Sequence, residues 1–406
     1  MSPDPIPVLI VDDDPVFALF VRQLVDSLGS EMPCVSEWVD TGEKALLEIQ
    51  RQPYELVLLD YHLPGANGLE VLAQIQELPA DRQPAVIMLT ASGNEAIAVE
   101  AMKRGAKDYL PKVGLDVPPL IRALKSALAQ KHLTAQVARY NQQMQADLDM
   151  ARKLQQSLLP DKYPSFPGAA PPGQSTLRFE HRYQSTEALA GDFFGVVALS
   201  DTAAGMFICD VMGHGVRAAL VTAMVRALLD ELAPVVRDPG RFLTEMNHKL
   251  AAILKQTDGP IFATAFYLIA DVAAGELRYA NAGHPRPLHL QRGAGQVGPL
   301  PMSQRGGPAL GVFAQSIYTT NHCLLGADDV VLLFTDGLVE VAAPDGGADY
   351  GPARLLAAAQ ERISLPLANL LDELLADVRK FSGAGAFADD VCLLGMQAAL
   401  PDRSKP

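Results

Sequence analysis

Residues 8–15 read VLIVDDDP, in which four apolar residues lead directly into Asp12, Asp13 and Asp14. An apolar run of this kind is typical of a strand buried on both faces of a sheet. Adjacent carboxylates about 4 Å apart repel each other by about 4 kcal/mol at an effective dielectric constant near 20. The cluster therefore needs a cation, or a change of protonation, to offset this repulsion.

Aspartates adjoin apolar runs at three further places in the chain. Residues 208–215 read ICDVMGHG, residues 330–337 read VVLLFTDG and residues 387–394 read FADDVCLL. We therefore expect two separate metal sites, one near the N-terminus and one built from these later segments.

Composition limits the class of protein. The chain has 406 residues, more than one compact core holds, so we expect two or three domains. Its 49% hydrophobic and 20% charged residues are typical of a folded globular protein, and its formal net charge of −14 argues against nucleic-acid binding. Four cysteines, Cys34, Cys209, Cys323 and Cys392, occur without a CxxC pair, which favours reduced core thiols.

No segment predicts a membrane span or a signal peptide. Every apolar run is interrupted by Asp, Gly or Pro well before the roughly 20 residues needed to cross a bilayer. The N-terminal MSPDPIPVLIVDDDP lacks a basic region, and its apolar stretch runs into acids. We therefore expect a cytoplasmic protein with no membrane partner.

From Val8 to about Leu128, short Val/Ile/Leu runs alternate with amphipathic helical stretches. This alternation predicts a first domain, residues 1–128, with a doubly wound parallel α/β sheet of the flavodoxin-like kind. In such sheets the working residues lie at the carboxyl ends of the strands.

A single long helix is predicted from Pro118 to Pro160, where glycine is absent and proline occurs only at the ends. Apolar residues recur there at steps of three and four, close to the helical or coiled-coil period. They are Leu133, Val137, Tyr140, Met144, Leu148, Ala151, Leu154 and Leu158. Residues 129–160 thus predict a linker helix that either forms a homodimeric coiled coil or packs on its own domains.

Residues 161–176 are rich in proline and glycine and predict a connecting linker or surface loop. In residues 177–400, β-branched and aromatic runs bounded by Gly, Pro and Asp follow one another, with helical segments between some of them. Successive strands without an intervening helix indicate antiparallel pairing, so we expect an α+β domain in which helices cover sheets.

Five polar residues of the first domain lie at predicted strand ends. Asp12 and Asp13 end the first strand, Asp60 the third, Thr90 the fourth and Lys112 the fifth. Each alone is most simply a turn, a helix cap or a solvated residue. Together, in this order, they converge at one edge of a parallel sheet, where working residues of such sheets lie.

This set resembles the receiver domain of two-component response regulators over residues 8 to about 128. The resemblance implies that Asp60 accepts a phosphoryl group from a sensor histidine kinase or a phosphotransfer protein. It implies a Mg²⁺ site formed by three carboxylates: Asp12, Asp13 and Asp60. It also implies that Thr90 and Lys112 contact the phosphate.

Two neighbouring residues have secondary roles. Tyr109 resembles the aromatic reporter of the family, whose rotation accompanies movement of Thr90, and simple edge packing is the alternative. Asp14 is predicted to be a solvent-facing or capping residue.

Several carboxylates of the second domain lie at the ends of predicted strands. They are Asp192 in LAGDFFG, Asp210 in CDVMGHG, Asp336 in FTDG, and the pair Asp389 and Asp390 in ADDV. Carboxylates spread over a whole domain indicate a binuclear centre whose two cations activate water and hold phosphate oxygens. No GxSxG, HExxH or phosphate-loop motif offers another chemistry.

These motifs resemble the PPM-type metal-dependent serine/threonine protein phosphatases, in the sporulation stage II E-like bacterial branch that regulates sigma-factor partner switching. The resemblance runs from about Ala151 to Leu394 and includes ARKLQQSLLP at 151–160, FATAFY at 262–267 and YANAGHPRPL at 279–288. It implies an antiparallel β-sandwich flanked by helices, and hydrolysis of phosphoserine by in-line attack of water without a covalent intermediate.

The same resemblance implies two Mn²⁺ or Mg²⁺ ions, bridged by Asp210. Their ligands would be the Val211 backbone carbonyl and the catalytic carboxylates Asp192, Asp210, Asp336 and Asp389. Between Asp389 and Asp390 the family register favours Asp389, and the residues alone leave this choice open.

The chain departs from the family pattern at two places. Gly195 stands where the first motif often has a further Asp, so any support from that carboxylate is missing. His214 lies two positions beyond the histidine acid of the eukaryotic relatives, so we assign it no such role. His284 in the NAGHP segment is interpreted as structural.

The sequence thus predicts a response regulator, phosphorylated on Asp60, that controls a phosphatase acting on a phosphoserine protein such as an anti-sigma-factor antagonist. The alternative is a non-catalytic adaptor that binds a sigma factor or anti-sigma factor through a phosphatase-like domain. A cyclic-nucleotide or DNA-binding output has no supporting motif. The linker helix could transmit phosphorylation to the metal site, with a sign that the sequence leaves open.

Overall fold

The structure is a computed structural model that describes residues 4–80, 82–91, 95–171, 174–186, 188–255, 261–303, 306–344, 346–383 and 387–399. Pro172 and Gly173 of the predicted connection lie outside these ranges. The chain divides into two compact units, Met1–Gln145 and Ala146–Pro406, so the division falls inside the segment predicted as a separate linker helix. Within the described ranges, no helix combines the length and apolar character that crossing a bilayer requires.

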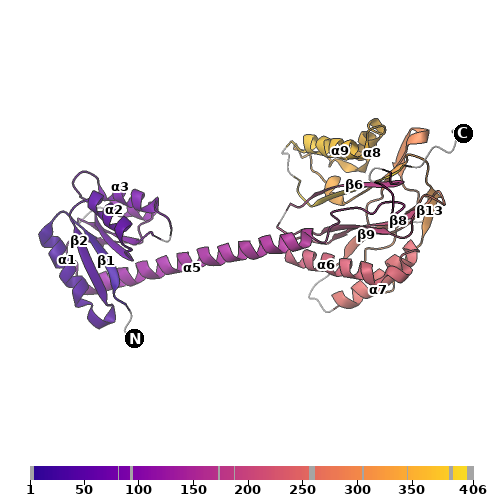
Figure 1. Cartoon of the computed structure of the whole chain (residues 1–406). Coiled ribbons are helices and arrows are strands. Elements are labelled where there is room, and N and C mark those ends of the chain that lie inside the picture. The colour runs from indigo at the N-terminus through magenta and orange to yellow at the C-terminus, as the bar shows by residue number, and fades with distance from the viewer. Residues whose placement is uncertain are drawn as a thin grey trace. The chain divides into compact units, whose positions relative to one another are not determined.

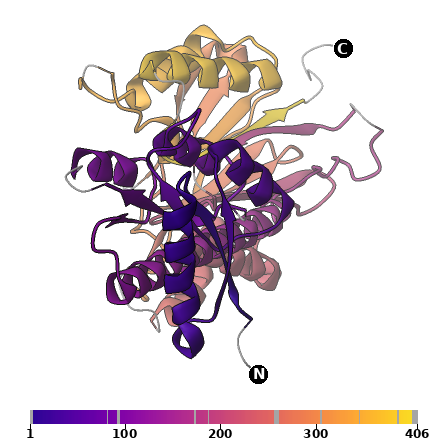
Figure 2. The same cartoon turned by 90° about the vertical axis from the view of Figure 1, so that its left-hand side faces the viewer.

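The first unit is a parallel five-stranded sheet with helices on both faces (Figure 2). Its strands, in the spatial order β2-β1-β3-β4-β5, are β1 (Ile6–Val11), β2 (Cys34–Val39), β3 (Leu56–Asp60), β4 (Ala85–Thr90) and β5 (Asp108–Pro111). Helices α1 (Pro15–Ser27) and α5 (Val117–Gln156) pack on one face, and α2 (Gly42–Arg51), α3 (Gly68–Gln76) and α4 (Glu95–Lys103) on the other. The predicted doubly wound parallel sheet is confirmed.

Helix α5 is a single helix of 40 residues, as the spacing predicts, although it ends at Gln156 and not at Pro160. Its first turns bury Leu120, Leu124 and Leu128 against the sheet. Beyond them the predicted apolar residues are about half exposed or more at Leu133, Val137, Tyr140, Met144 and Leu154. These side chains form an apolar stripe on a helix that is otherwise solvated.

The second unit is an antiparallel β-sandwich of two five-stranded sheets. One sheet has the order β13-β10-β9-β8-β7 and contains β7 (Asp192–Ala198), β8 (Ala203–Val211), β9 (Ala263–Asp271), β10 (Glu276–Ala282) and β13 (Asn321–Leu324). The other has the order β12-β11-β14-β15-β6 and contains β6 (Leu177–Gln184), β11 (Leu288–Gln291), β12 (Gln296–Pro299), β14 (Val330–Phe334) and β15 (Val391–Ala398). The antiparallel sandwich implied by the family resemblance is confirmed.

Helices cover both outer faces of this sandwich (Figure 1). Helices α6 (Val216–Glu231) and α7 (Pro239–Leu254) lie on one sheet, and α8 (Gly351–Glu361) and α9 (Leu367–Ser382) on the other. Strand β8 shows why the layers form, because successive side chains of a strand point to opposite faces. Phe207 and Cys209 pack with α6 and α7, whereas Met206 and Ile208 are buried between the sheets.

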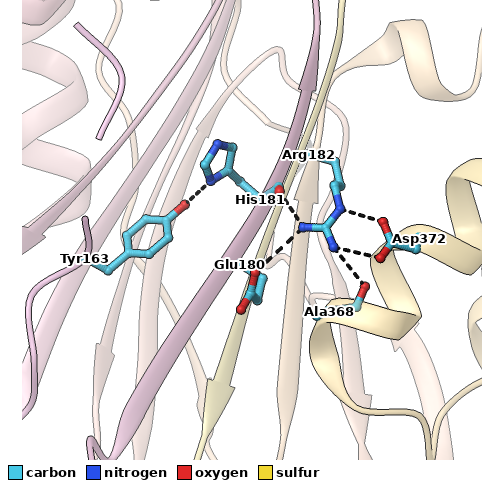
Figure 3. Close-up of polar contacts among 6 residues, drawn as sticks. All are labelled: Tyr163, Glu180, His181, Arg182, Ala368 and Asp372. Atoms are coloured by element: carbon cyan, nitrogen blue, oxygen red, sulfur yellow. Dashed lines mark hydrogen bonds and ion pairs between the residues drawn. The ribbon is translucent and has the colours of Figure 1, made fainter. Parts of the chain in front are cut away.

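Strand β6 lies at a sheet edge and is held by side chains from two directions (Figure 3). Arg182 of β6 makes a bidentate pair with Asp372 of α9, with Nε–Oδ1 and Nη2–Oδ2 distances of 2.6 and 2.8 Å. The Tyr163 hydroxyl lies 2.7 Å from Nδ1 of His181. Phe166 is fully buried between the sheets. The predicted connection at 161–176 is therefore anchored on the sandwich at Tyr163 and Phe166.

Candidate functional site

Three carboxylates meet at the carboxyl ends of β1 and β3, which are neighbours in the first sheet. Asp12 and Asp13 follow β1, and Asp60 is the last residue of β3. One oxygen from each lies within 4.8 Å of the others. Asp12 and Asp60 are buried, and Asp60 Oδ1 has no hydrogen-bond partner among the described residues. Because a buried oxygen without a partner is costly, the group fits an oxygen-coordinated cation such as Mg²⁺.

Lys112, which follows β5, bridges two of these carboxylates. Its Nζ lies 2.7 Å from Asp12 Oδ2 and 2.8 Å from Asp60 Oδ2. Burial disfavours the ammonium ion, but the bonds to Asp12 and Asp60 outweigh burial and raise the pKa of Lys112. Burial raises the pKa of Asp12, with hydrogen bonds from Lys112 and the Asp14 amide acting in the opposite direction. The lysine therefore stays charged and offsets part of the repulsion in the cluster.

Two residues beside this cluster fix the β1–α1 turn. Asp14 caps α1, since its side chain accepts a hydrogen bond of 2.9 Å from the Val16 amide, which confirms the capping interpretation. The Trp38 indole of β2 donates a hydrogen bond of 2.9 Å to the Asp12 carbonyl oxygen. Sequence reasoning missed Trp38. As the chain's one tryptophan, it is a built-in fluorescence probe of the site.

Thr90 and Tyr109 lie on adjacent strands at the same edge of the sheet. Thr90 is the buried last residue of β4 and is paired with Pro111 of β5. Tyr109 is 44% exposed and lines a surface cavity with Ala98 and Met102 of α4. Their predicted switch roles remain predictions.

The acidic residues of the second unit come from four segments. Asp192 begins β7 and lies opposite Asp210 of β8. Asp336 directly follows the Thr335 that succeeds β14, and Asp389 and Asp390 precede β15. Burial, followed by the charges of Asp336, Asp389 and Asp390, raises the pKa of Asp210 to about 7. The structure thus brings the predicted carboxylates close enough to repel one another.

Burial also changes the pKa of two carboxyl groups beside Asp210, those of Asp192 and Asp336. It raises the pKa of Asp192 well above its ordinary value, and the charge of Asp210 adds to the effect. Burial and the charge of Asp389 raise the pKa of Asp336. In the ranges that the structure describes, no Lys or Arg forms an ion pair with any of these carboxylates. Their repulsion is thus left for a cation or a proton to offset.

These oxygens are spread more widely than those of the first site. In the part of the chain that the structure describes, Asp12, Asp13 and Asp60 are the one set of three potential ligands within 4.8 Å of one another. Two cations about 3.5 to 4 Å apart need donors over a longer span than one cation does. The wider donor set of Asp210, Asp336 and Asp389 is therefore compatible with a pair of ions.

Asp389 and Asp390 differ in what their side chains contact. Asp390 is buried, and its Oδ2 accepts a hydrogen bond of 2.8 Å from the Gly191 amide, while Oδ1 accepts one of 2.9 Å from the Thr186 amide. Asp389 is exposed. Asp390 thus anchors the 186–191 loop, which favours Asp389 as the metal ligand.

Three contributors to this site were missed from the sequence. The Thr335 hydroxyl donates a hydrogen bond of 2.7 Å to Asp192 Oδ2. Glu340 lies near Asp336, because its amide donates a hydrogen bond of 2.8 Å to the Asp336 carbonyl oxygen. Burial and the Asp336 charge raise the pKa of Glu340, and its position four residues after Asp336 was a usable signal. Gly191 passes so close to β8 that an added Cβ would lie 2.7 Å from the Val211 carbonyl oxygen.

The two histidines and Gly195 are placed as follows. His284 is buried, its Nδ1 lies 2.8 Å from the Thr264 hydroxyl, and burial lowers its pKa to about 3, so it is neutral. His214 is exposed. A Cβ at Gly195 would touch Leu229 and the Phe193 ring. Position 195 therefore faces the apolar layer under α6.

The two folds with their acidic sites define a receiver domain joined to a phosphatase domain of the PP2C type. Residues 8–125 belong to the response regulator receiver domain family, and residues 200–399 belong to the Stage II sporulation protein E (SpoIIE) family.

Individual relatives match one part of the chain or the other. Phosphoserine phosphatase RsbP of Bacillus subtilis is 25% identical over 61% of this chain and 57% of its own length. Nitrate/nitrite response regulator protein NarL of Escherichia coli is 32% identical over 31% of this chain and 56% of its own length. The chain thus spans a little over half the length of each. The solved SiaA-PP2C domain of Pseudomonas aeruginosa shares the fold, with a TM-score of 0.54 at 22% identity over 64% of this chain and 99% of that one.

Proposed function

We propose that this chain is a response regulator whose output is a metal-dependent protein serine phosphatase. The observation that carries the proposal is the set of carboxylates around Asp210, in which burial and neighbouring negative charges raise the pKa of Asp192, Asp210 and Asp336 and no described Lys or Arg forms an ion pair. Divalent cations bound between these carboxylates would neutralise their mutual repulsion and so stabilise the fold.

Two Mn²⁺ or Mg²⁺ ions would be held by Asp192, Asp210, Asp336, Asp389 and the Val211 carbonyl. Bound there, they would supply an activated water and neutralise the oxygens of a phosphate ester. Asp192 would be oriented by its hydrogen bond from Thr335. Asp390 and Gly191 would hold the loop that carries Asp192 against β8.

In the receiver domain, Asp60 would accept a phosphoryl group from a sensor histidine kinase or a phosphotransfer protein. Mg²⁺ would be bound by Asp12, Asp13 and Asp60, and Thr90 and Lys112 would contact the transferred group. Tyr109 would rotate as Thr90 moves.

The substrate would be a phosphoserine on a regulatory protein such as an anti-sigma-factor antagonist, in the cytoplasm. Two findings support this: the SpoIIE family match over residues 200–399, and the similarity to a protein named phosphoserine phosphatase.

Helix α5 would couple the two chemistries. Its last turn is bonded to the loop before Asp192: the Gln155 side chain donates 2.7 Å to the Ala190 carbonyl and accepts 3.0 Å from the Ala190 amide. Arg152 donates to the Ala188 carbonyl at 2.8 Å. A change in α5 on phosphorylation of Asp60 would therefore reach the metal site through these bonds. The exposed apolar stripe from Leu133 to Met144 would pair two copies of the chain in a homodimer.

The test is hydrolysis of p-nitrophenyl phosphate with and without Mn²⁺ by the wild type and by Asp210→Ala. We expect Mn²⁺-dependent turnover that falls by about a thousandfold or more in the variant, as for other groups that act in the transition state. Asp230→Ala is the matched control, because Asp230 is exposed and pairs only with Arg226 four residues earlier on α6. Absence of both turnover and calorimetric Mn²⁺ binding, even after acetyl phosphate treatment, would favour the adaptor alternative.

A further inference from the structure

A cavity of about 590 Å³ opens in the phosphatase unit beside the predicted metal site. It is lined by residues from the turn after β10 and from the segment after β12: Asn281, Gly283, His284, Arg286, Met302, Ser303 and Gly306. Its volume lies in the range of pockets that hold a ligand, about 300 to 1,000 Å³. None of the chemistry described above uses it.

The cavity is tied to the strand that carries Asp210. Thr264 of β9 lies directly opposite Asp210 of β8. The Thr264 hydroxyl lies 2.8 Å from Nδ1 of His284. The turn that carries Arg286 follows β10, which is separated from Asp210 of β8 by the single strand β9, and the Thr264–His284 contact lies at the end of the sheet that carries Asp210.

Asn281 and Gly306 fix part of the cavity wall. Buried Asn281 clamps the turn, since its Oδ1 accepts from the His284 amide and its Nδ2 donates to the His284 carbonyl, both at 2.8 Å. Gly306 packs so tightly that an added Cβ would lie 3.1 Å from the Asn281 side chain. Because the side-chain amide of Asn281 is already satisfied within the protein, it holds the shape of the cavity, whereas the buried Nε2 of His284 has no hydrogen-bond partner among the described residues.

Arg286 supplies the charge of the cavity. It is exposed, and no carboxylate among the described residues forms an ion pair with it. The carboxylates of the metal site repel acidic groups of a substrate. The positive charge of Arg286 opposes this repulsion within the cavity, so the cavity should bind an acidic side chain more tightly than the corresponding amide. A guanidinium binds a carboxylate with two parallel hydrogen bonds.

We propose that this cavity receives an acidic side chain close to the phosphoserine of the protein substrate, with Arg286 as the residue that selects it. The proposal rests on the proposed phosphatase function and names the substrate class of that site: phosphoserine segments with Glu or Asp nearby.

The experiment measures binding of fluorescent phosphoserine peptides to the full chain by anisotropy, in the presence of Mn²⁺. Three peptides of equal length carry Glu, Gln or Lys on both sides of the phosphoserine. The wild type should bind the Glu peptide about tenfold more tightly than the Gln peptide, as for a hydrogen bond to a charged group. Arg286→Gln should lose this preference, and Arg286→Glu should reverse it in favour of the Lys peptide.

Lys380→Gln is the charge-matched control, since Lys380 is exposed on α9 and outside the cavity, and it should keep the wild-type preference. Equal binding of the Glu and Gln peptides by the wild type, or an unchanged preference in Arg286→Gln, would overturn the proposal. The reversal in Arg286→Glu separates recognition from misfolding, because an unfolded variant gains no partner. Hydrolysis of the same peptides reports on the phosphatase function: a retained charge preference without Mn²⁺-dependent turnover would refute that function and leave the cavity's role standing.

Discussion

At the residue scale, Asp210 makes metal binding sensitive to pH. Burial and the neighbouring carboxylates raise its pKa to about 7, and a cation binds the ionised form only. Protons therefore compete with Mn²⁺ below that pH, and the apparent affinity should fall by about tenfold for each pH unit below 7 and level off above it. Isothermal titration calorimetry between about pH 5.5 and 8 measures this dependence. A flat profile over that range would contradict the assignment.

The same shift predicts how stability changes when chelator removes the metal. Between the ordinary pKa of an aspartate, 3.8, and about 7, the folded state holds a proton on Asp210 that the unfolded state has released. Stability falls with rising pH wherever the folded state binds more protons, so the melting temperature in chelator should drop across this window. Added Mn²⁺ should restore it above pH 7, where the ionised carboxylate is available.

At the element scale, the last turn of α5 is predicted to set the position of the 186–191 loop. Gln155→Ala removes both bonds to Ala190 and leaves a backbone amide and carbonyl without their partner. Each unsatisfied group costs about 1–3 kcal/mol, so the loop should loosen and Mn²⁺ affinity should weaken by about tenfold. Calorimetry on Gln155→Ala and on Gln156→Ala, whose side chain is exposed on the same turn, makes the comparison. Equal affinities in the two variants would contradict this role of α5.

Helices and strands with strong apolar periodicity were predictable from the sequence. Strands that are stabilised by contacts with residues distant in the sequence were not. The buried strands β1, β3 and β4 contain Val/Ile/Leu runs of the kind from which the parallel sheet was predicted. The residues of the second strand, β2, could not be identified from the sequence, because β2 is an edge strand with one buried residue, Ser36. Polar LRFEHRYQ of β6 forms a strand because it pairs with β15 and is fastened by Arg182 to Asp372. The Arg182–Asp372 pair joins residues 190 positions apart, so no short stretch of the sequence predicts it.

The site shows the same limit. Both acidic clusters were predictable from the strand-end aspartates, because a carboxylate next to an apolar run can be recognised in the sequence. Trp38 reaches Asp12 through the pairing of β2 with β1, and Thr335, which follows β14, reaches Asp192 of β7 in the facing sheet. Their contributions are contacts of the folded chain, and a threonine before Asp336 has no local feature that marks it as a partner of Asp192.

At the scale of the whole molecule, the predicted link between Asp60 and the metal site runs along α5. Replacing Gln136–Asp147 with a flexible Gly/Ser segment of equal length should leave both chemistries intact and abolish their dependence on each other. The measurements are Trp38 fluorescence on adding Mg²⁺ and acetyl phosphate, which reports the receiver, and Mn²⁺-dependent ester hydrolysis before and after that treatment. Phosphate-dependent turnover that persists in the Gly/Ser variant would refute coupling through the helix.

A second replacement of the same residues, with Ala, Glu and Lys in a helix-forming order, separates two ways in which α5 could act. It keeps the helix continuous, because those residues have high helix propensity, but removes Val137, Tyr140 and Met144 from the exposed stripe. Coupling that survives this change would be carried by the continuous helix within one chain. Coupling lost together with a dimer, as seen by light scattering, would be carried by the stripe, because only pairing of two copies depends on those apolar side chains.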